Sequence, residues 1–279
     1  MRILLTGPRG FVGARVMAEL RKEYEKTSGN AFMNEFQIIP APPLRGADQD
    51  MIRQLIDRVQ PDLIIHTAAM SDISACEKDP DGSYLANVKI PVYLAEMGVK
   101  LVAFSTDQVY SGSGGQGPYS EHEVCPDNLY ARQKLEMEQR TLQANPDTVL
   151  LRASWMYDMP MYGLPNRGNF LVNMLTSRVL SFSSAQYRAV TYVREVARHI
   201  MKAASLPGGV YNYGSENDLS MMETARWLKE TLSLPVSIQN AGPRHNLWMD
   251  CSKAEGFGIT FQNTKEGLET CIKDYGLLR

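Results

Sequence analysis

A phenol and an ammonium group stand four residues apart in the sequence, at Tyr130 and Lys134. This spacing places the two side chains on one face of a helix. A free phenol has a pKa of about 10 and is a poor acid–base catalyst near neutral pH, but an adjacent cation stabilises the phenolate and lowers that pKa. The pair therefore predicts acid–base catalysis. The alternative is an incidental surface pair, because the same spacing also arises by chance.

Polar side chains gather where the strand predicted over residues 100–105 ends, in the run Ser105-Thr106-Asp107. The carboxyl edge of a parallel sheet is where α/β proteins bind their ligands. A hydroxyl in this turn, such as that of Thr106, can hydrogen-bond a substrate carbonyl while Tyr130 protonates the alkoxide that forms from it. The alternative for Thr106 and Asp107 is that they only cap the loop.

Three glycines separate an apolar run from a helical pattern near the N-terminus, in the sequence TGPRGFVG of residues 6–13. Glycine lets the backbone turn tightly and approach a pyrophosphate closely, and the helix that follows presents its N-terminus to the anion. A tight turn between strand and helix, without a ligand, is the alternative. Because the motif directly follows a buried strand, we expect dinucleotide binding here.

The end of the second predicted strand bears on the choice between NAD and NADP. An acidic residue there would bind the ribose 2′-hydroxyl of NAD, whereas a basic residue nearby would favour the 2′-phosphate of NADP. The strand ends in Ile39-Pro40-Ala41-Pro42, without an acid, and Arg9 lies in the glycine loop. Arg9 resembles the arginine at the same loop position in NADP-dependent relatives such as GDP-fucose synthase, and this resemblance favours NADP(H) over NAD(H) as the cofactor. A solvated or surface-paired Arg9 is the alternative.

These residues must be positioned by a common framework. Short β-rich runs alternate with helical stretches, which is typical of a parallel sheet covered by helices on both faces. We expect an α/β protein with a doubly wound parallel Rossmann sheet and a smaller C-terminal substrate-binding α/β part. Strands are predicted over residues 1–6, 36–39, 61–66, 100–105 and 148–152, and helices from residue 11 and over 50–59, 81–97, 129–142, 193–204 and 220–232.

The rhythm of strands and helices becomes irregular beyond Ala153. We expect the NAD(P)-binding Rossmann domain at residues 1–153 and a mainly substrate-binding part at 154–279, with about 181–205 returning to the first domain. The Pro- and Gly-rich stretch 159–168 predicts a long surface loop.

With the glycine loop, the hydroxyl turn and the YxxxK pair together, the chain resembles the extended short-chain dehydrogenase/reductase superfamily. Within it, the chain is most similar to the RmlD-like, dTDP-4-dehydrorhamnose reductase group. The resemblance implies Thr106, Tyr130 and Lys134 as catalytic residues. It also implies a cofactor site formed by Thr6, Gly7, Arg9, Gly10, Phe11, Val12, Gly13, Ala68, Ala69, Tyr130 and Lys134.

The similarity continues through most of the chain, in the segments 66–69, 71–77, 151–157, 168–170 and 244–253. It implies substrate-binding roles for Asp107, Trp155, Asn169 and Arg188, although Trp155 as a core aromatic is the alternative. Two departures bear on the substrate. The family's Q-x-G-x-P-T-Y segment reads QYRAVTY at residues 186–192, with Arg188 gained, and His66 replaces a usual Asn.

As the resemblance implies, we expect reduction of a 4-keto group on a nucleotide-activated 6-deoxy sugar by NAD(P)H. One alternative is a sugar-nucleotide epimerase or dehydratase of the same superfamily, which would return the hydride within each cycle. Another is a non-catalytic dinucleotide-binding regulatory subunit, like the relative that regulates methionine adenosyltransferase. Dimers are frequent among the relatives, so a homodimer is also considered, although no sequence stripe specifies its interface.

The net charge of −2 gives no reason to expect nucleic acid or an anionic membrane as a partner. The four cysteines show neither CxxC nor metal-ligand spacing, so we expect reduced thiols and no metal site. His122, His199 and His245 show no partner pattern, and we interpret them as solvated or capping. Without a signal peptide or a segment long enough to span a bilayer, a cytoplasmic location is the expectation.

Overall fold

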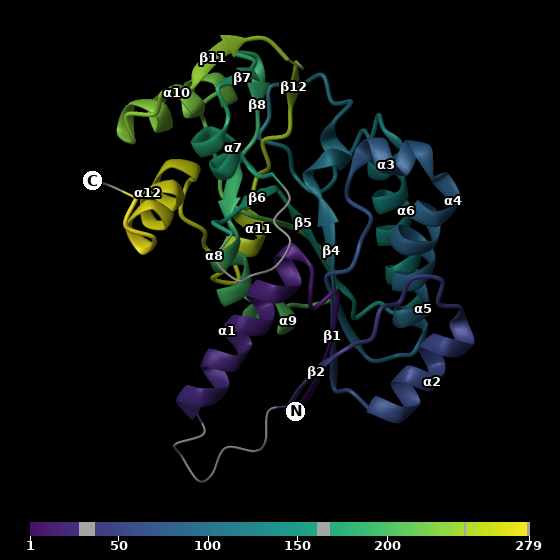
Figure 1. The fold of residues 1–279 in the computed structure, drawn as a ribbon. Coiled ribbons are helices and arrows are strands. Elements are labelled where there is room, and N and C mark those ends of the chain that lie inside the picture. Colours follow the sequence, from purple (N-terminus) through teal and green to yellow (C-terminus); the bar gives the residue numbers. More distant parts are fainter. Residues whose placement is uncertain (28–36, 161–167, 243, 278–279) are drawn as a thin grey trace. The chain divides into compact units, whose positions relative to one another are not determined.

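A computed structural model describes residues 1–27, 37–160, 168–242 and 244–277. Its central sheet contains β1 (Arg2–Thr6), β2 (Gln37–Pro40), β3 (Leu63–His66), β4 (Lys100–Thr106), β5 (Val149–Ala153) and β10 (Gly209–Tyr213). The strand order is β10-β5-β4-β3-β1-β2, and β1 pairs in parallel with both β2 and β3, as β3 does with β4 (Figure 1). All residues of β3 and β5 are buried, as expected for strands covered on both faces. The predicted doubly wound parallel sheet is confirmed.

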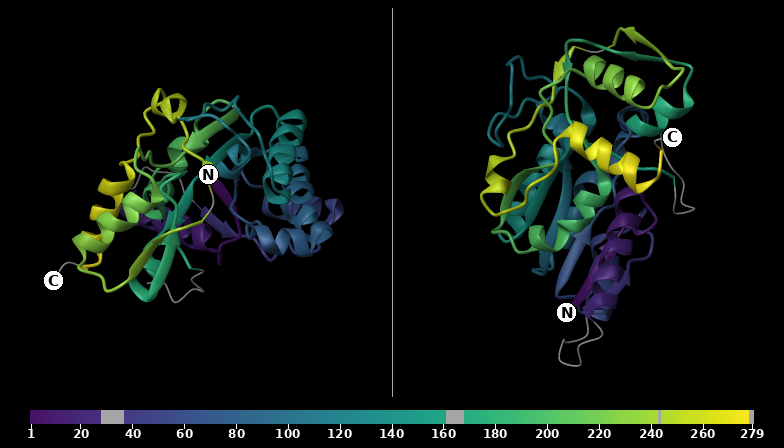
Figure 2. Two further views of the ribbon diagram at one scale, coloured as in Figure 1. Left: turned by 90° about the horizontal axis from the view of Figure 1, so that it is seen from above. Right: turned by 90° about the vertical axis from the view of Figure 1, so that its left-hand side faces the viewer.

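Helices cover both faces of this sheet. One face carries α2 (Gln49–Val59), α5 (Ile90–Glu96) and α6 (Leu129–Ala144), and the other carries α1 (Phe11–Thr27) and α9 (Ile200–Ala204) (Figures 1 and 2). The core under the first group joins strands to helices, and it includes Leu4, Ile64, Leu101, Ile52, Leu94 and Met137. This core fixes the position of α6 along β4, the strand whose end carries Thr106.

The helix predicted over residues 81–97 is divided. It consists of α4 (Pro80–Tyr84), a π-helical turn η1 (Leu85–Lys89) and α5, and a short α3 (Ile73–Lys78) precedes it. Pro91 has no N–H to donate, and its ring would clash with the carbonyl of Asn87 in a regular helix. The widened π-helical turn just before it relieves that clash. The predicted helix 193–204 is likewise divided, into α8 (Val193–Arg198) and α9.

The chain forms two compact units. The first unit comprises residues 1–106, 128–151 and 197–211, and the second unit comprises residues 107–127, 152–196 and 212–279. The expected domain boundary after residue 153 remains a prediction. Residues 107–127 belong to the second unit, and of the returning segment only the part from residue 197 onward joins the first.

The second unit is built from pairs of short parallel strands with helices around them. The pairs are β6 (Trp155–Tyr157) with β9 (Val190–Tyr192), β7 (Val179–Phe182) with β11 (Ser237–Asn240), and β8 (Gln186–Tyr187) with β12 (His245–Asn246). Its helices include α7 (Phe170–Thr176), α10 (Met221–Thr231), α11 (Ser252–Glu255) and α12 (Thr264–Asp274). As predicted, α10 begins at a capping box of Ser220 with Glu223. Most of the predicted loop 159–168 lies outside the described residues.

No helix within the described ranges is both long and apolar enough to cross a membrane.

Candidate functional site

The glycine loop of the first unit connects β1 to α1 through a tight turn. Gly7 has a φ of +66°, and its carbonyl accepts a hydrogen bond from the N–H of Gly10 at 2.9 Å. A Cβ at Gly13 would lie 2.1 Å from the Gly7 oxygen, which is too close for any residue other than glycine. Phe11 and Val12 then form the first turn of α1. The loop thus ends in a helix N-terminus, whose free N–H groups favour an anion.

The strand order places this loop at a switch point of the sheet. From the neighbouring strands β1 and β3, the chain continues in opposite directions, to β2 and to β4, and ligands of open α/β sheets bind in the crevice formed there. The Thr67 hydroxyl, just after β3, donates to the carbonyl of Thr6 at 2.7 Å. A Cβ on Gly7 would lie 2.9 Å from the nitrogen of Ala68. The structure therefore brings the segment containing Ala68 and Ala69 beside the glycine loop, and this cradle fits a dinucleotide pyrophosphate.

The edge beyond β2 carries cationic rather than acidic side chains. Asp48 is the first acid after β2, and its carboxylate is used as the N-cap of α2, where it accepts from the N–H of Met51. Arg9 in the glycine loop is exposed, as is Arg45 in the loop after β2. Arg45 was not among the predicted cofactor-binding residues. Its position directly after the second strand is the signal that would have identified it.

The YxxxK pair lies on α6, which begins at Asn128. The side chain of Asn128 caps the helix by accepting from the N–H of Ala131 at 2.9 Å. Tyr130 and Lys134 are 7% and 2% exposed, so both face the interior. The Lys134 ammonium donates to the carbonyl of Phe104 at 2.7 Å. Since Phe104 precedes Thr106 by two residues on β4, this bond fastens the pair to the strand end that carries the predicted catalytic hydroxyl.

Burial lowers the pKa of Lys134 to about 8, and the negative charge of Glu138 acts in the opposite direction. A buried ammonium with this pKa is still largely charged at neutral pH. It can therefore stabilise a neighbouring phenolate, which is the electrostatic condition that acid catalysis by Tyr130 requires.

His66 ends β3 and lies in the same electrostatic environment. Its Nδ1 is 2.8 Å from the hydroxyl of Thr6, and its Nε2 is buried with no hydrogen-bond partner in the described part of the chain. Burial, and secondarily the charge of Lys134, lowers the pKa of His66 to about 3. The imidazole is therefore neutral at neutral pH. A buried imidazole thus stands where the family resemblance implied an amide.

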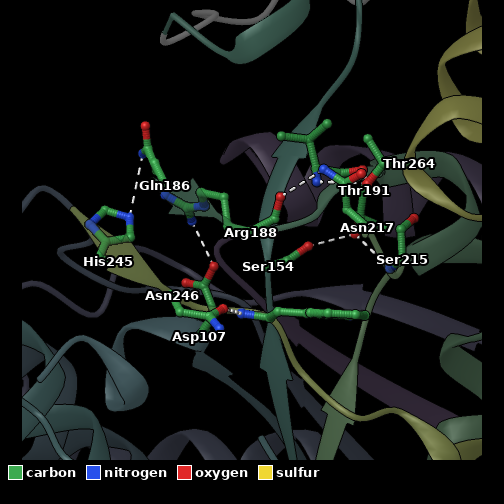
Figure 3. A network of polar contacts seen from close by, with 12 residues as sticks. Asp107, Ser154, Gln186, Arg188, Thr191, Ser215, Asn217, His245, Asn246 and Thr264 are labelled. Carbon is green, nitrogen blue, oxygen red and sulfur yellow. Dashed lines mark hydrogen bonds and ion pairs between the residues drawn. The ribbon is translucent and has the colours of Figure 1, made fainter. Parts of the chain in front are cut away.

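Three of the predicted substrate-binding residues, Asp107, Trp155 and Arg188, meet in the second unit, and Figure 3 shows Asp107 with Arg188. Asp107, the first residue of a 3₁₀ turn, η2 (Asp107–Tyr110), is buried, and its carboxylate lies 2.7 Å from Nη2 of Arg188. The Arg188 guanidinium lies over the ring of Trp155, 5.3 Å from its centroid. Its Nε is buried with no hydrogen-bond partner among the described residues. In this cluster the Arg188 guanidinium forms an ion pair with Asp107 and a cation–π contact with Trp155.

His245 extends this cluster. It lies on β12, which pairs with β8, and its Nε2 is 3.4 Å from the side-chain nitrogen of Gln186 (Figure 3). Burial, followed by the charge of Arg188, lowers the pKa of His245 to about 4. His245 is thus a half-buried, neutral group with a side-chain partner, rather than the solvated or capping residue that we expected. The strand pairing that joins it to Gln186 spans 59 residues and leaves no local sequence signal.

Asn169 is not part of this cluster. It caps α7, accepting from the N–H of Val172 at 3.2 Å and donating to the carbonyl of Asp158 at 2.9 Å. The oxygen and the nitrogen of its side-chain amide therefore both form hydrogen bonds with backbone groups. Its predicted contact with substrate remains a prediction.

Comparison with known proteins gives consistent matches over the whole chain. The model of the family described as "RmlD substrate binding domain" matches residues 1–276. A dTDP-4-dehydrorhamnose reductase of Aggregatibacter actinomycetemcomitans is 27% identical over 240 residues, covering 80% of this chain and 76% of the relative. Methionine adenosyltransferase 2 subunit beta of Mus musculus is also 27% identical, over 284 residues, covering 92% of this chain and 83% of the relative.

A crystal structure of dTDP-4-dehydrorhamnose reductase from Bacillus anthracis in complex with NADP has the same fold. It matches with a TM-score of 0.82 at 23% identity, covering 98% of this chain and 99% of that one. The reductase and the methionine adenosyltransferase subunit are each 27% identical to this chain. Sequence identity therefore does not decide which of the two proteins this chain resembles in its role.

Proposed function

This chain belongs to the RmlD substrate binding domain family of the extended short-chain dehydrogenases/reductases, and we propose that it reduces a nucleotide-activated 4-keto-6-deoxy sugar with NAD(P)H. The observation that carries the proposal is the Lys134 ammonium, buried beside the end of β4 and in line with Tyr130 on α6. Burying a lysine is costly, and buried groups with a perturbed pKa cluster at functional sites, which supports a catalytic role for this residue.

The glycine loop, together with Ala68 and Ala69, would hold the nicotinamide cofactor, which would supply the hydride when bound. Tyr130 donates its phenolic proton to the oxygen of the former keto group, and Thr106 orients that oxygen by hydrogen bonding. Lys134 keeps its position through Phe104 and stabilises the phenolate that Tyr130 leaves behind. These roles rest on the family resemblance together with the geometry of α6 and β4.

We further propose NADP(H) as the preferred cofactor. The absence of an acid between β2 and Asp48 removes the usual partner of the NAD ribose, and both Arg9 and Arg45 are exposed at the loops concerned. An arginine can bind a 2′-phosphate with two parallel hydrogen bonds.

For the substrate, we propose that Asp107, Trp155 and Arg188 contact the nucleotide sugar, with Asn169 as a further candidate. The Arg188 guanidinium is paired with Asp107, so the pair together carries no net charge. Such a site favours hydrogen bonding to hydroxyl groups over capture of a highly charged group, and the Trp155 ring offers a face for stacking.

The test is oxidation of NADPH and of NADH, followed at the nicotinamide absorbance, with dTDP-, GDP-, UDP- and CDP-linked 4-keto-6-deoxyhexoses as acceptors. We expect turnover with one of them. Tyr130→Phe should lose about 100-fold or more of that rate while still binding NADPH. Tyr93→Phe, which alters a tyrosine at the edge of the core, is the matched control and should retain it. A Tyr130→Phe protein with the full rate would refute the assignment.

The match to methionine adenosyltransferase 2 subunit beta favours one second candidate, a dinucleotide-binding regulatory subunit. A stable complex with an enzyme, together with NADPH binding and no turnover with any acceptor, would support that candidate instead.

A further inference from the structure

A third ionisable side chain continues the stripe of Tyr130 and Lys134 on α6. Glu138 lies one turn beyond Lys134 and is 2% exposed. The Ser105 hydroxyl on β4 donates to its carboxylate at 2.5 Å. Burying a carboxylate this deeply costs free energy unless the group is paired or hydrogen-bonded. The hydrogen bond from Ser105 offsets part of that cost.

The partners of this stripe are consecutive residues of β4. The carbonyl of Phe104 accepts from the Lys134 ammonium, the Ser105 hydroxyl donates to the Glu138 carboxylate, and Thr106 is the proposed catalytic hydroxyl. The end of one strand thus positions both charged groups of one helix face. Because helix and strand are packed by a common core, the two contacts hold each other in register.

Several titratable groups from different elements act on Lys134. Cys76 lies on α3 and His66 on β3, in addition to Glu138 on α6 itself. Burial raises the pKa of the Cys76 thiol, which is therefore protonated at neutral pH, and His66 is neutral as well. Among the side chains that oppose the loss of the lysine proton, Glu138 has the largest effect, followed by Cys76.

We propose that Glu138 is a positioning residue whose carboxylate, oriented by Ser105, keeps the Lys134 side chain in its ammonium form. Its catalytic consequence rests on the proposed function, since it acts only through Lys134 and Tyr130. The effect on Lys134 itself does not, and can be measured in the absence of any substrate. Glu138 sets the upper limit of pH at which the ammonium can stabilise a phenolate.

The experiment is a titration of the lysine side chains by NMR in protein labelled with ¹³C at the lysine ε-carbon. The signal of Lys134 is assigned by its loss in Lys134→Arg. Removing an opposite charge at close range shifts a pKa by about one unit or more, so in Glu138→Gln the Lys134 titration should move down by that amount. Glu138→Asp keeps the charge and should restore most of the wild-type value.

Glu136→Gln is the matched control, because Glu136 lies on the same helix but has an exposed side chain that contacts Arg140. It should leave the Lys134 titration unchanged. If Glu138→Gln does not fold, Ser105→Ala, which removes only the hydrogen bond to the carboxylate, should still lower the titration point measurably. A Lys134 titration unmoved in the folded Glu138→Gln protein, or in Ser105→Ala where Glu138→Gln is unfolded, would overturn the proposal.

Activity provides a second readout. With the Lys134 pKa reduced from about 8 to about 7, the ammonium fraction falls about fivefold at pH 8 but by only about a tenth at pH 6. The Glu138→Gln enzyme should therefore lose kcat/KM at the alkaline end of the profile and little at the acidic end. A uniform loss at all pH values would indicate structural damage and overturn the inference. Absence of turnover in the wild type would instead count against the proposed function and leave the NMR result to decide about Glu138.

Discussion

Replacing His66 by Asn, the residue that the family resemblance implies at this position, should make the stability of the protein less sensitive to acid. The folded protein holds His66 neutral down to a pKa of about 3, whereas the unfolded chain protonates it at its ordinary value of 6.5. Between these two values the unfolded state binds more protons than the folded state. The free energy of unfolding therefore falls as the pH is lowered through this window.

The magnitude follows from the two pKa values. Above about pH 7 the imidazole is neutral in both states and contributes almost nothing to the pH dependence. Each unit below 6.5 costs up to about 1.4 kcal/mol, so lowering the pH from about 7 to about 5 should cost roughly 2 kcal/mol through His66 alone. His66 is only 1% exposed, so solvent does not screen this contribution to the free energy of unfolding.

Urea unfolding of the wild type and of His66→Asn at the two pH values gives the comparison. The lost hydrogen bond to Thr6 changes stability equally at both and cancels in the difference. We expect the wild type to lose roughly 2 kcal/mol more than the variant. His122→Asn is the control, because His122 is exposed, and it should lose as much as the wild type. Equal losses in wild type and His66→Asn would refute the buried, neutral state of His66.

Three further outcomes are expected. Gly13→Ala places a Cβ against the Gly7 carbonyl. It should lower the free energy of unfolding by about 1–3 kcal/mol, measured by thermal unfolding, or abolish NADPH binding, measured by fluorescence titration. Gly114→Ala, whose Cβ would lie in open space, is the control and should do neither. Arg9→Ser should weaken NADPH binding about tenfold while changing NADH binding little, and equal effects on both cofactors would contradict the 2′-phosphate role. Arg188→Met removes the guanidinium that pairs with the buried Asp107 carboxylate and should cost about 3 kcal/mol or more in urea unfolding. Asp107→Asn in the same chain should restore most of this loss; without that restoration the ion pair is not the cause.

The glycine loop and the YxxxK pair could be predicted from sequence because their geometry is local. The turn of residues 6–13 and the one-turn spacing of Tyr130 and Lys134 depend only on backbone conformation over a few residues. The alternation of apolar runs likewise predicted the doubly wound sheet. Four substrate-binding residues were predicted, and the structure brings Asp107, Trp155 and Arg188 together but not Asn169.

What sequence could not supply are contacts between residues far apart in the chain. The Ser105–Glu138 bond and the Arg188–Asp107 pair join residues 33 and 81 positions apart, and no local pattern indicates either. For the same reason no local pattern indicated that residues 107–127 form part of the second compact unit. The π-helical turn before Pro91 was missed because proline predicts that a helix is interrupted but not how the chain adapts.

The most direct measurement of the central claim is the fate of the hydride. The protein would be incubated with NADPH carrying deuterium at the transferable position of the nicotinamide, together with the 4-keto sugar nucleotide that supports turnover. We predict one deuterium at the reduced carbon of the product sugar and one NADPH oxidised per product formed. A product without deuterium, or formed without net oxidation of NADPH, would contradict a reductase and point to the epimerase or dehydratase chemistry of the same superfamily.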